Sequence, residues 1–180
     1  MLDQAEQNLR RWFAGSIVAS PDGKPLGVYH GTAADVRRFD PALSGSKSKT
    51  GAPHGTFFFT DRSDVAASYT VAWQGDFSST YHDSANVMPV YLSLRRPLKV
   101  NARGASWREI LFRGEEMDIN ELAALAQSSG RYDGLVVQQV RDKGVGHVDA
   151  PISTTDRRAI TAHVARAWLD GAGQRKTPHV

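Results

Sequence analysis

The chain of 180 residues contains no cysteine, which excludes disulfide bonds, thiolate nucleophiles and cysteine-ligated zinc. No apolar run approaches the roughly 20 residues that a membrane-spanning helix needs, so we expect no membrane association. The N-terminal stretch carries acidic residues and is typical of an amphipathic helix, not of a signal peptide, which favours a cytoplasmic location in the host or target cell. Histidines 30, 54, 82 and 147 do not have the spacing of metal ligands, and we expect no metal.

The chain also lacks a concentrated run of basic residues, and its last third has no glutamate after Glu121. The net charge of +3 permits an acidic or phosphate-bearing ligand without requiring one. The basic pairs at 37–38, 95–96 and 157–158 are scattered and lack the interleaved aromatics of a nucleic-acid groove. No glutamate follows Glu121, so the last third of the chain offers only aspartate as an acidic group.

What is present predicts a mixture of strands and helices. A first helix is expected to end at Phe13 with Asp3 as its N-cap. Further helices are expected over residues 64–73, 106–113, 118–129 and 155–169, and loops over 40–55 and 75–86. Strands are expected over residues 16–19, 26–31, 56–60, 87–100 and 132–140, the first two joined by a turn at 20–25. The order lacks βαβ regularity, which favours an α+β fold.

The expected organisation is one domain over residues 1–170, followed by a disordered tail over 171–180. No internal repeat and no second domain boundary interrupts it.

The stretch GVYHGT, residues 27–32, combines strand-forming residues with a histidine, a glycine and a hydroxyl group. Gly31 has no side chain, so a ligand can lie against its backbone. His30 and Thr32 add polar groups beside it. By itself a histidine here is more often a structural residue that bonds a neighbour.

A second stretch, GTFFFTDRSDVAASY at 55–69, supplies aromatic surface. Tyr69 falls on an expected helix, where an aromatic residue usually packs into a core. Its alternative role is a platform on which a planar ring stacks.

Several blocks of the chain, in order, resemble the ADP-ribosyltransferase domain of phage and mobile-element polyvalent proteins. These are WFxGSxV (12–18), DGKPLGVYHGT (22–32), RRFDP (37–41), GTFFFTDRSDVAASY (55–69), VMPVYLSLRRPL (87–98) and YDGLVV (132–137). That domain is similar in fold to the poly(ADP-ribose) polymerase and diphtheria-toxin group. The resemblance implies an α+β fold with a split β-sheet, an N-terminal and a C-terminal helix, and an NAD pocket between the halves of the sheet.

The resemblance also implies roles for residues. His30 would bond the adenosine ribose of NAD and the Gly31 backbone would pair with the nicotinamide amide, while Tyr69 would stack on the nicotinamide. The remaining cofactor-binding positions implied in this way are Tyr29, Thr32, Phe58 (with Phe57 as the alternative register) and Ser68.

The family's third motif is usually a glutamate that stabilises the charge formed as nicotinamide leaves. Our choice for this role is Asp149, because it is acidic and follows a β-like segment. Gln138, Thr155 and Asp156 stay open as alternatives.

The expected function is that of an NAD-dependent mono-ADP-ribosyltransferase with His30, Tyr69 and Asp149 as catalytic residues and NAD as co-substrate. The acceptor would be a macromolecule, protein being favoured over nucleic acid. An NAD glycohydrolase and a non-catalytic module that binds NAD or a partner are the alternatives.

Overall fold

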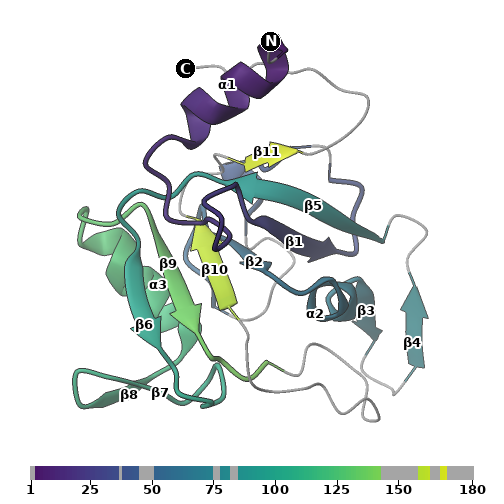
Figure 1. Cartoon of the computed structure of the whole chain (residues 1–180). Helices are drawn as coiled ribbons and strands as arrows, with labels where there is room; N and C mark the ends of the chain where they lie inside the picture. The colour runs from purple at the N-terminus through teal and green to yellow at the C-terminus, as the bar shows by residue number, and fades with distance from the viewer. Residues whose placement is uncertain are drawn as a thin grey trace.

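The computed structural model describes residues 3–36, 38–44, 51–74, 78–81, 85–142, 158–162 and 167–169. Three α-helices accompany a seven-stranded sheet and two small hairpins within these ranges (Figure 1). The sheet has the order β11-β5-β1-β2-β10-β9-β6, with β9 and β6 parallel and the other neighbours antiparallel. The fold is therefore α+β, as the sequence predicts.

The bounds of the elements follow from the backbone hydrogen bonds. The helices are α1 (Gln4–Phe13), α2 (Ser63–Ser68) and α3 (Ile119–Ser128), with a 3-10 turn at Pro41–Leu43. The strands of the large sheet are β1 (Gly27–Thr32), β2 (Phe57–Thr60), β5 (Asn86–Leu92), β6 (Leu98–Asn101), β9 (Gly134–Gln138), β10 (Arg158–Ala162) and β11 (Ala167–Leu169). The hairpins consist of β3 (Val71–Gln74) with β4 (Ser78–Tyr81), and of β7 (Ile110–Phe112) with β8 (Glu115–Met117).

The large sheet is split between β1 and β2. Six facing pairs join β1 to β5, and four join β2 to β10. Between β1 and β2 a single facing pair remains, Tyr29 with Thr60. The two strands diverge beyond this point, which separates a half built on β11-β5-β1 from a half built on β2-β10-β9-β6.

One core cluster, here the α3 cluster, lies between α3 and strands β6 and β9. Its buried members are Leu98, Val100, Ala102, Ile110, Ile119, Leu122, Ala123, Ala126, Leu135, Val137 and Val140. Helix α3 begins with a capping box in which Asp118 accepts from the backbone of Glu121 and Glu121 accepts from the backbone of Asp118. Apolar spacing and a strong start signal together explain why the sequence predicts this helix correctly.

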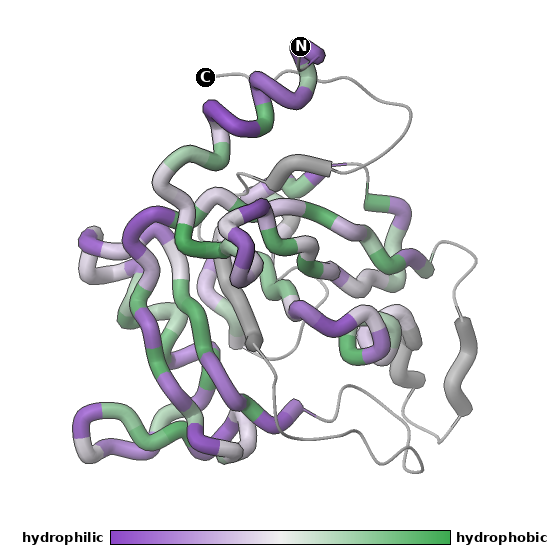
Figure 2. Tube along the Cα trace, viewed as in Figure 1, coloured by the Kyte–Doolittle hydropathy of each residue, from purple (hydrophilic) through white to green (hydrophobic). Residues whose placement is uncertain are grey.

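A second core cluster, here the Phe59 cluster, lies on the other face of the sheet. Its buried members are Val18, Val28, Phe59, Met88, Val90, Leu92, Leu94 and Val136. Hydrophobic residues recur along β5 and β9, whereas α1 is largely hydrophilic and buries only Phe13 (Figure 2). Helix α1 starts, as expected, with the Asp3 carboxylate accepting from the backbone N–H of Glu6.

The expected helix over 106–113 is wrong. Residues 110–112 pair with 115–117 in a hairpin whose turn residues, Arg113 and Gly114, have φ of 55° and 88°. Two successive positive φ values are the geometry of a type I′ turn, which matches the twist of paired strands. Ile110 is fully buried in the α3 cluster, so packing outweighs the helical tendency of this short segment.

The expected helix over 64–73 is too long. Helix α2 ends at Ser68, because the hydroxyls of Ser68 and Thr70 donate to the carbonyls of Val65 and Ala67 at 2.6 and 2.7 Å. The chain then continues as β3, and its partner β4 falls inside the expected loop 75–86. Arg62 occupies the N-cap of α2 without a capping hydrogen bond from its side chain.

The expected C-terminal helix over 155–169 is also wrong where the structure describes it. Residues 158–162 form β10 and residues 167–169 form β11. Strand β10 pairs on both sides, with β2 and with β9, and this long-range pairing overrides the helical propensity of an Ala- and Arg-rich segment. The expected tail over 171–180 lies outside the described residues.

The other expected strands are found with smaller changes. The 56–60 and 132–140 strands are β2 and β9, and the 87–100 strand is two strands, β5 and β6. They are separated at a turn where Asp133 accepts from the backbone N–H groups of Arg95 and Arg96. The expected strand 16–19 is reduced to one bridge between Ala19 and Pro25. In the part of the chain that is described, no helix has the length and apolar character to cross a membrane.

Candidate functional site

His30 lies at the end of β1, where the sheet splits. Its Nδ1 is 2.8 Å from the carbonyl oxygen of Phe58 on β2. A carbonyl can only accept, so Nδ1 carries the proton and Nε2 keeps a lone pair. The side chain therefore bridges the two strands just beyond their last backbone pair.

The surroundings of His30 are aromatic. The ring centroid lies 5.1 Å from that of Phe39 and 5.6 Å from that of Phe59. Burial among these rings lowers the pKa of His30 below its ordinary value of 6.5, partly opposed by the hydrogen bond to Phe58. At neutral pH the imidazole is therefore uncharged, with Nε2 able to accept a hydrogen bond.

Gly31 faces the opposite side of β1, against helix α2. A β-carbon at this position would overlap the backbone carbonyl of Ala66. The sequence interpretation attributed Gly31 to the approach of a ligand, whereas the structure gives a second reason, the close packing of α2 on the strand. Since Ala66 precedes Tyr69 by three residues, the glycine also sets how near Tyr69 lies to β1.

Tyr69 occupies the C-cap of α2. Its backbone N–H donates to Ala66 at 3.0 Å, and its hydroxyl donates to Oδ2 of Asp142 at 2.8 Å. The pKa of Tyr69 is raised above its ordinary value by partial burial first and by the negative charge of Asp142 second. The residue as a whole is nevertheless 38% exposed, so Tyr69 is not enclosed in the core.

Asp142 is the residue of this site that the sequence interpretation missed. It follows β9 in the chain and is separated from Tyr69 by 73 positions. The backbone of Arg141, just before it, donates to Ala105 at 2.8 Å and accepts from Trp107 at 3.1 Å. No local pattern marks such a contact, because it depends on how distant segments pack.

The other predicted binding residues have defined partners in the fold. Thr32 accepts the backbone N–H of Ala34 through its hydroxyl at 3.1 Å, which shapes the loop after β1. The Ser68 hydroxyl donates to the Val65 carbonyl, so its lone pairs are the part left to bind an amide N–H. Tyr29 is half-buried and faces Thr60 and Pro89 on the neighbouring strands.

Phe57 and Phe58 point to opposite faces of the sheet. Phe57 packs against the Phe59 cluster, with its ring centroid 6.5 Å from that of His30. Phe58 packs against the α3 cluster, and its carbonyl holds His30. Phe58 thus contributes to the site through its backbone carbonyl.

The four candidates for the third motif divide into two groups. Asp149, Thr155 and Asp156 lie outside the described residues, so their role stays a prediction. Gln138 ends β9, where it faces Arg158 and Asn101 on the adjacent strands.

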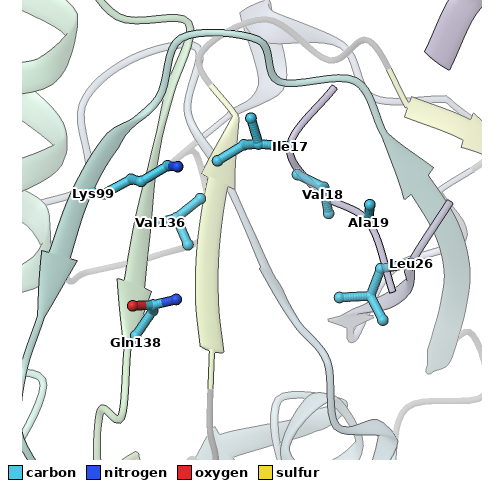
Figure 3. A pocket seen from close by; sticks show the side chains of 7 residues that line it. All are labelled: Ile17, Val18, Ala19, Leu26, Lys99, Val136 and Gln138. Carbon is cyan, nitrogen blue, oxygen red and sulfur yellow. The ribbon is translucent and has the colours of Figure 1, made fainter. Parts of the chain in front are cut away.

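Two hollows in the described part of the chain meet at Gln138. One, of about 220 Å³, lies between residues 17–19 and 26 and the side chains of Lys99, Val136 and Gln138 (Figure 3). The other, of about 410 Å³, is lined by Ser20, Pro21, Leu26, Asp61, Asn101, Gln138 and Gln139. His30, Gly31 and Tyr69 line neither of these two hollows.

The described residues contain no group of three or more histidine, aspartate or glutamate side chains that could hold a metal ion. The polar groups near the sheet split are instead a neutral imidazole, backbone groups, hydroxyls and the Asp142 carboxylate. Such a set suits hydrogen bonding to sugar hydroxyls and an amide.

Comparison with known proteins adds one finding. A family model described as "ADP-Ribosyltransferase in polyvalent proteins" matches residues 21–163, well over half of the chain. The matched range contains β1, β2, α2, α3, β9 and β10. The comparisons with curated proteins and with solved structures gave no match.

Proposed function

Because this chain belongs to the family of ADP-ribosyltransferases found in polyvalent proteins, we propose that it is an NAD-dependent mono-ADP-ribosyltransferase with a macromolecular acceptor. The family uses NAD as its substrate. The observation that carries the proposal is the position of His30 at the sheet split, next to Gly31, which packs on α2. There the imidazole of His30 is neutral and its tautomer is fixed by the hydrogen bond to Phe58.

The proposed binding mode uses the groups that the site leaves available. Nε2 of His30 accepts a hydrogen bond from a ribose hydroxyl, which a protonated imidazole could not do. The nicotinamide amide bonds the backbone of Gly31, and its ring stacks on the open part of Tyr69. Tyr29, Thr32, Phe58 and Ser68 complete the surroundings.

In the reaction, the bond between ribose C1 and the nicotinamide nitrogen breaks, and its electron pair leaves with nicotinamide. Positive charge develops on the ribose, and a carboxylate in the cleft would stabilise it. We assign this task to Asp149. A nucleophile on the acceptor then bonds C1 and gives up its proton to solvent or to a nearby base.

The test is to incubate the protein with labelled NAD and a host lysate, and to measure both nicotinamide release and label on macromolecules. Transfer that protease removes and nuclease spares is the expected result and identifies a protein acceptor. Nicotinamide release without macromolecular label would replace the transferase by an NAD glycohydrolase. Binding of NAD without nicotinamide release would favour a non-catalytic module.

A further inference from the structure

The contact between Tyr69 and Asp142 joins the two halves of the split sheet. Tyr69 follows α2, which packs on β1, whereas Asp142 follows β9 in the other half. We propose that Asp142 is a positioning residue that fixes the ring of Tyr69 for stacking on the nicotinamide of NAD. This inference rests on the proposed function, since it assumes that Tyr69 contacts NAD.

The backbone end of Tyr69 is fixed to the β1 half. Its N–H donates to the carbonyl of Ala66, the same group against which Gly31 packs. The position of the Cα of Tyr69 is thereby tied to the strand end that carries His30. A tie at the backbone leaves the side-chain torsions of a tyrosine free, so a second contact is needed to orient the ring.

The Asp142 carboxylate supplies that second contact from a well-anchored segment. Val140 is 1% exposed within the α3 cluster, and Arg141 is bonded through both its N–H and its carbonyl to residues 105–107. The carboxylate oxygen then accepts from the Tyr69 hydroxyl at 2.8 Å.

The exposure of Tyr69 separates this arrangement from ordinary core packing. A tyrosine that serves only the core would bury its ring. Tyr69 is held at its backbone and at its hydroxyl while 38% of it stays exposed. A ring that is fixed in advance loses little side-chain freedom when a ligand stacks on it.

Calorimetric titration with NAD on the folded chain of 180 residues tests the inference. Asp142→Ala and Tyr69→Phe remove the same hydrogen bond from its two sides, and each should weaken NAD binding about fivefold. The double variant should bind no more weakly than either single variant, because the contact can be lost only once. Asp142→Asn keeps an oxygen acceptor and should stay within about twofold of the parent protein.

Asp22→Ala is the matched control, since Asp22 also accepts from a hydroxyl, that of Ser20, but in the turn before β1. It should bind NAD like the parent protein. In steady-state assays of nicotinamide release, Asp142→Ala should raise KM about fivefold and leave kcat within about twofold.

Other results would overturn the inference. If folded Asp142→Ala binds NAD as the parent does, Asp142 only supports stability. If Asp142→Asn binds NAD as weakly as Asp142→Ala does, the negative charge of Asp142 supports binding and its hydrogen bond to Tyr69 does not. If Asp142→Ala lowers kcat with unchanged binding, the carboxylate acts on the reacting atoms. If the parent protein itself does not bind NAD, the proposed function and the role of Asp142 fail together, which distinguishes this case from the others.

Discussion

The two core clusters of this protein are built from the same kinds of strands but differ in what they enclose. The α3 cluster consists entirely of aliphatic side chains, under a helix with a complete capping box. The Phe59 cluster borders His30, a titratable ring that lies among aromatic neighbours and bonds the adjacent strand. The difference indicates that one face of the sheet is packed only by aliphatic side chains, while the packing on the other face borders a polar, titratable ring.

The largest effect should come from the α3 cluster. Leu122 is fully buried, and Leu122→Ala should lower the free energy of unfolding by about 2–5 kcal/mol, measured by urea denaturation. NAD affinity of the folded variant should stay unchanged. Leu111→Ala is the control, because Leu111 is 68% exposed and should change stability by less than about 0.5 kcal/mol. Loss of NAD binding by folded Leu122→Ala would mean that the two regions are not separable.

Gly31→Ala should have the next largest effect and should act on both properties. The new β-carbon meets the Ala66 carbonyl, so α2 must shift, at a cost of about 1–3 kcal/mol in unfolding free energy. NAD binding should weaken at the same time, because Tyr69 moves with α2. Gly27→Ala is the matched control on the same strand, since a β-carbon there has no neighbour within 4 Å. Equal behaviour of the two variants would contradict the close packing of α2.

His30→Ala should weaken NAD binding by about fivefold, the loss of one hydrogen bond to a ribose hydroxyl. Met88→Ala serves as control, because Met88 lies on β5 directly opposite His30 and belongs to the Phe59 cluster. It should lower stability and leave NAD affinity unchanged. If Met88→Ala impairs binding as strongly as His30→Ala, the imidazole acts by packing alone.

The smallest effect concerns pH. The pKa of His30 is lower in the folded protein than its ordinary value of 6.5, so the unfolded chain takes up a proton first as pH falls. Stability from this group is complete above pH 6.5 and is lost as pH falls below it, with a slope of at most about 1.4 kcal/mol per pH unit. His30→Gln should flatten this part of the stability profile. An unchanged profile would show that His30 does not titrate with folding.

Much of the fold could be predicted where local signals agree with packing. Asp118 and Glu121 mark the start of α3, and the apolar run at 134–137 marks β9. Prediction fails where distant partners decide. Residues 158–162 form a strand because they pair with β2 on one side and with β9 on the other. The sequence of the segment itself does not indicate these partners.

The same reason limits prediction of the site. Their motifs make His30, Gly31 and Tyr69 candidates for the site, because each motif occupies one stretch of chain. Asp142 is not marked in this way, since its contact is with a residue 73 positions away. The packing of Gly31 on Ala66 could not be predicted either. The sequence shows that Gly31 has no side chain, but it does not show which group occupies the free space.

The position of β10 has a consequence for how the protein is made. This strand comes from residues 158–162 but lies in the middle of the sheet, between β2 and β9. During synthesis, β2 and β9 therefore remain as open edges until the ribosome has released the segment that joins them, and such edges invite pairing with other chains. Sequence-distant pairing of this kind is also slow to form. The sheet therefore cannot close on a nascent chain until residues 158–162 have been released.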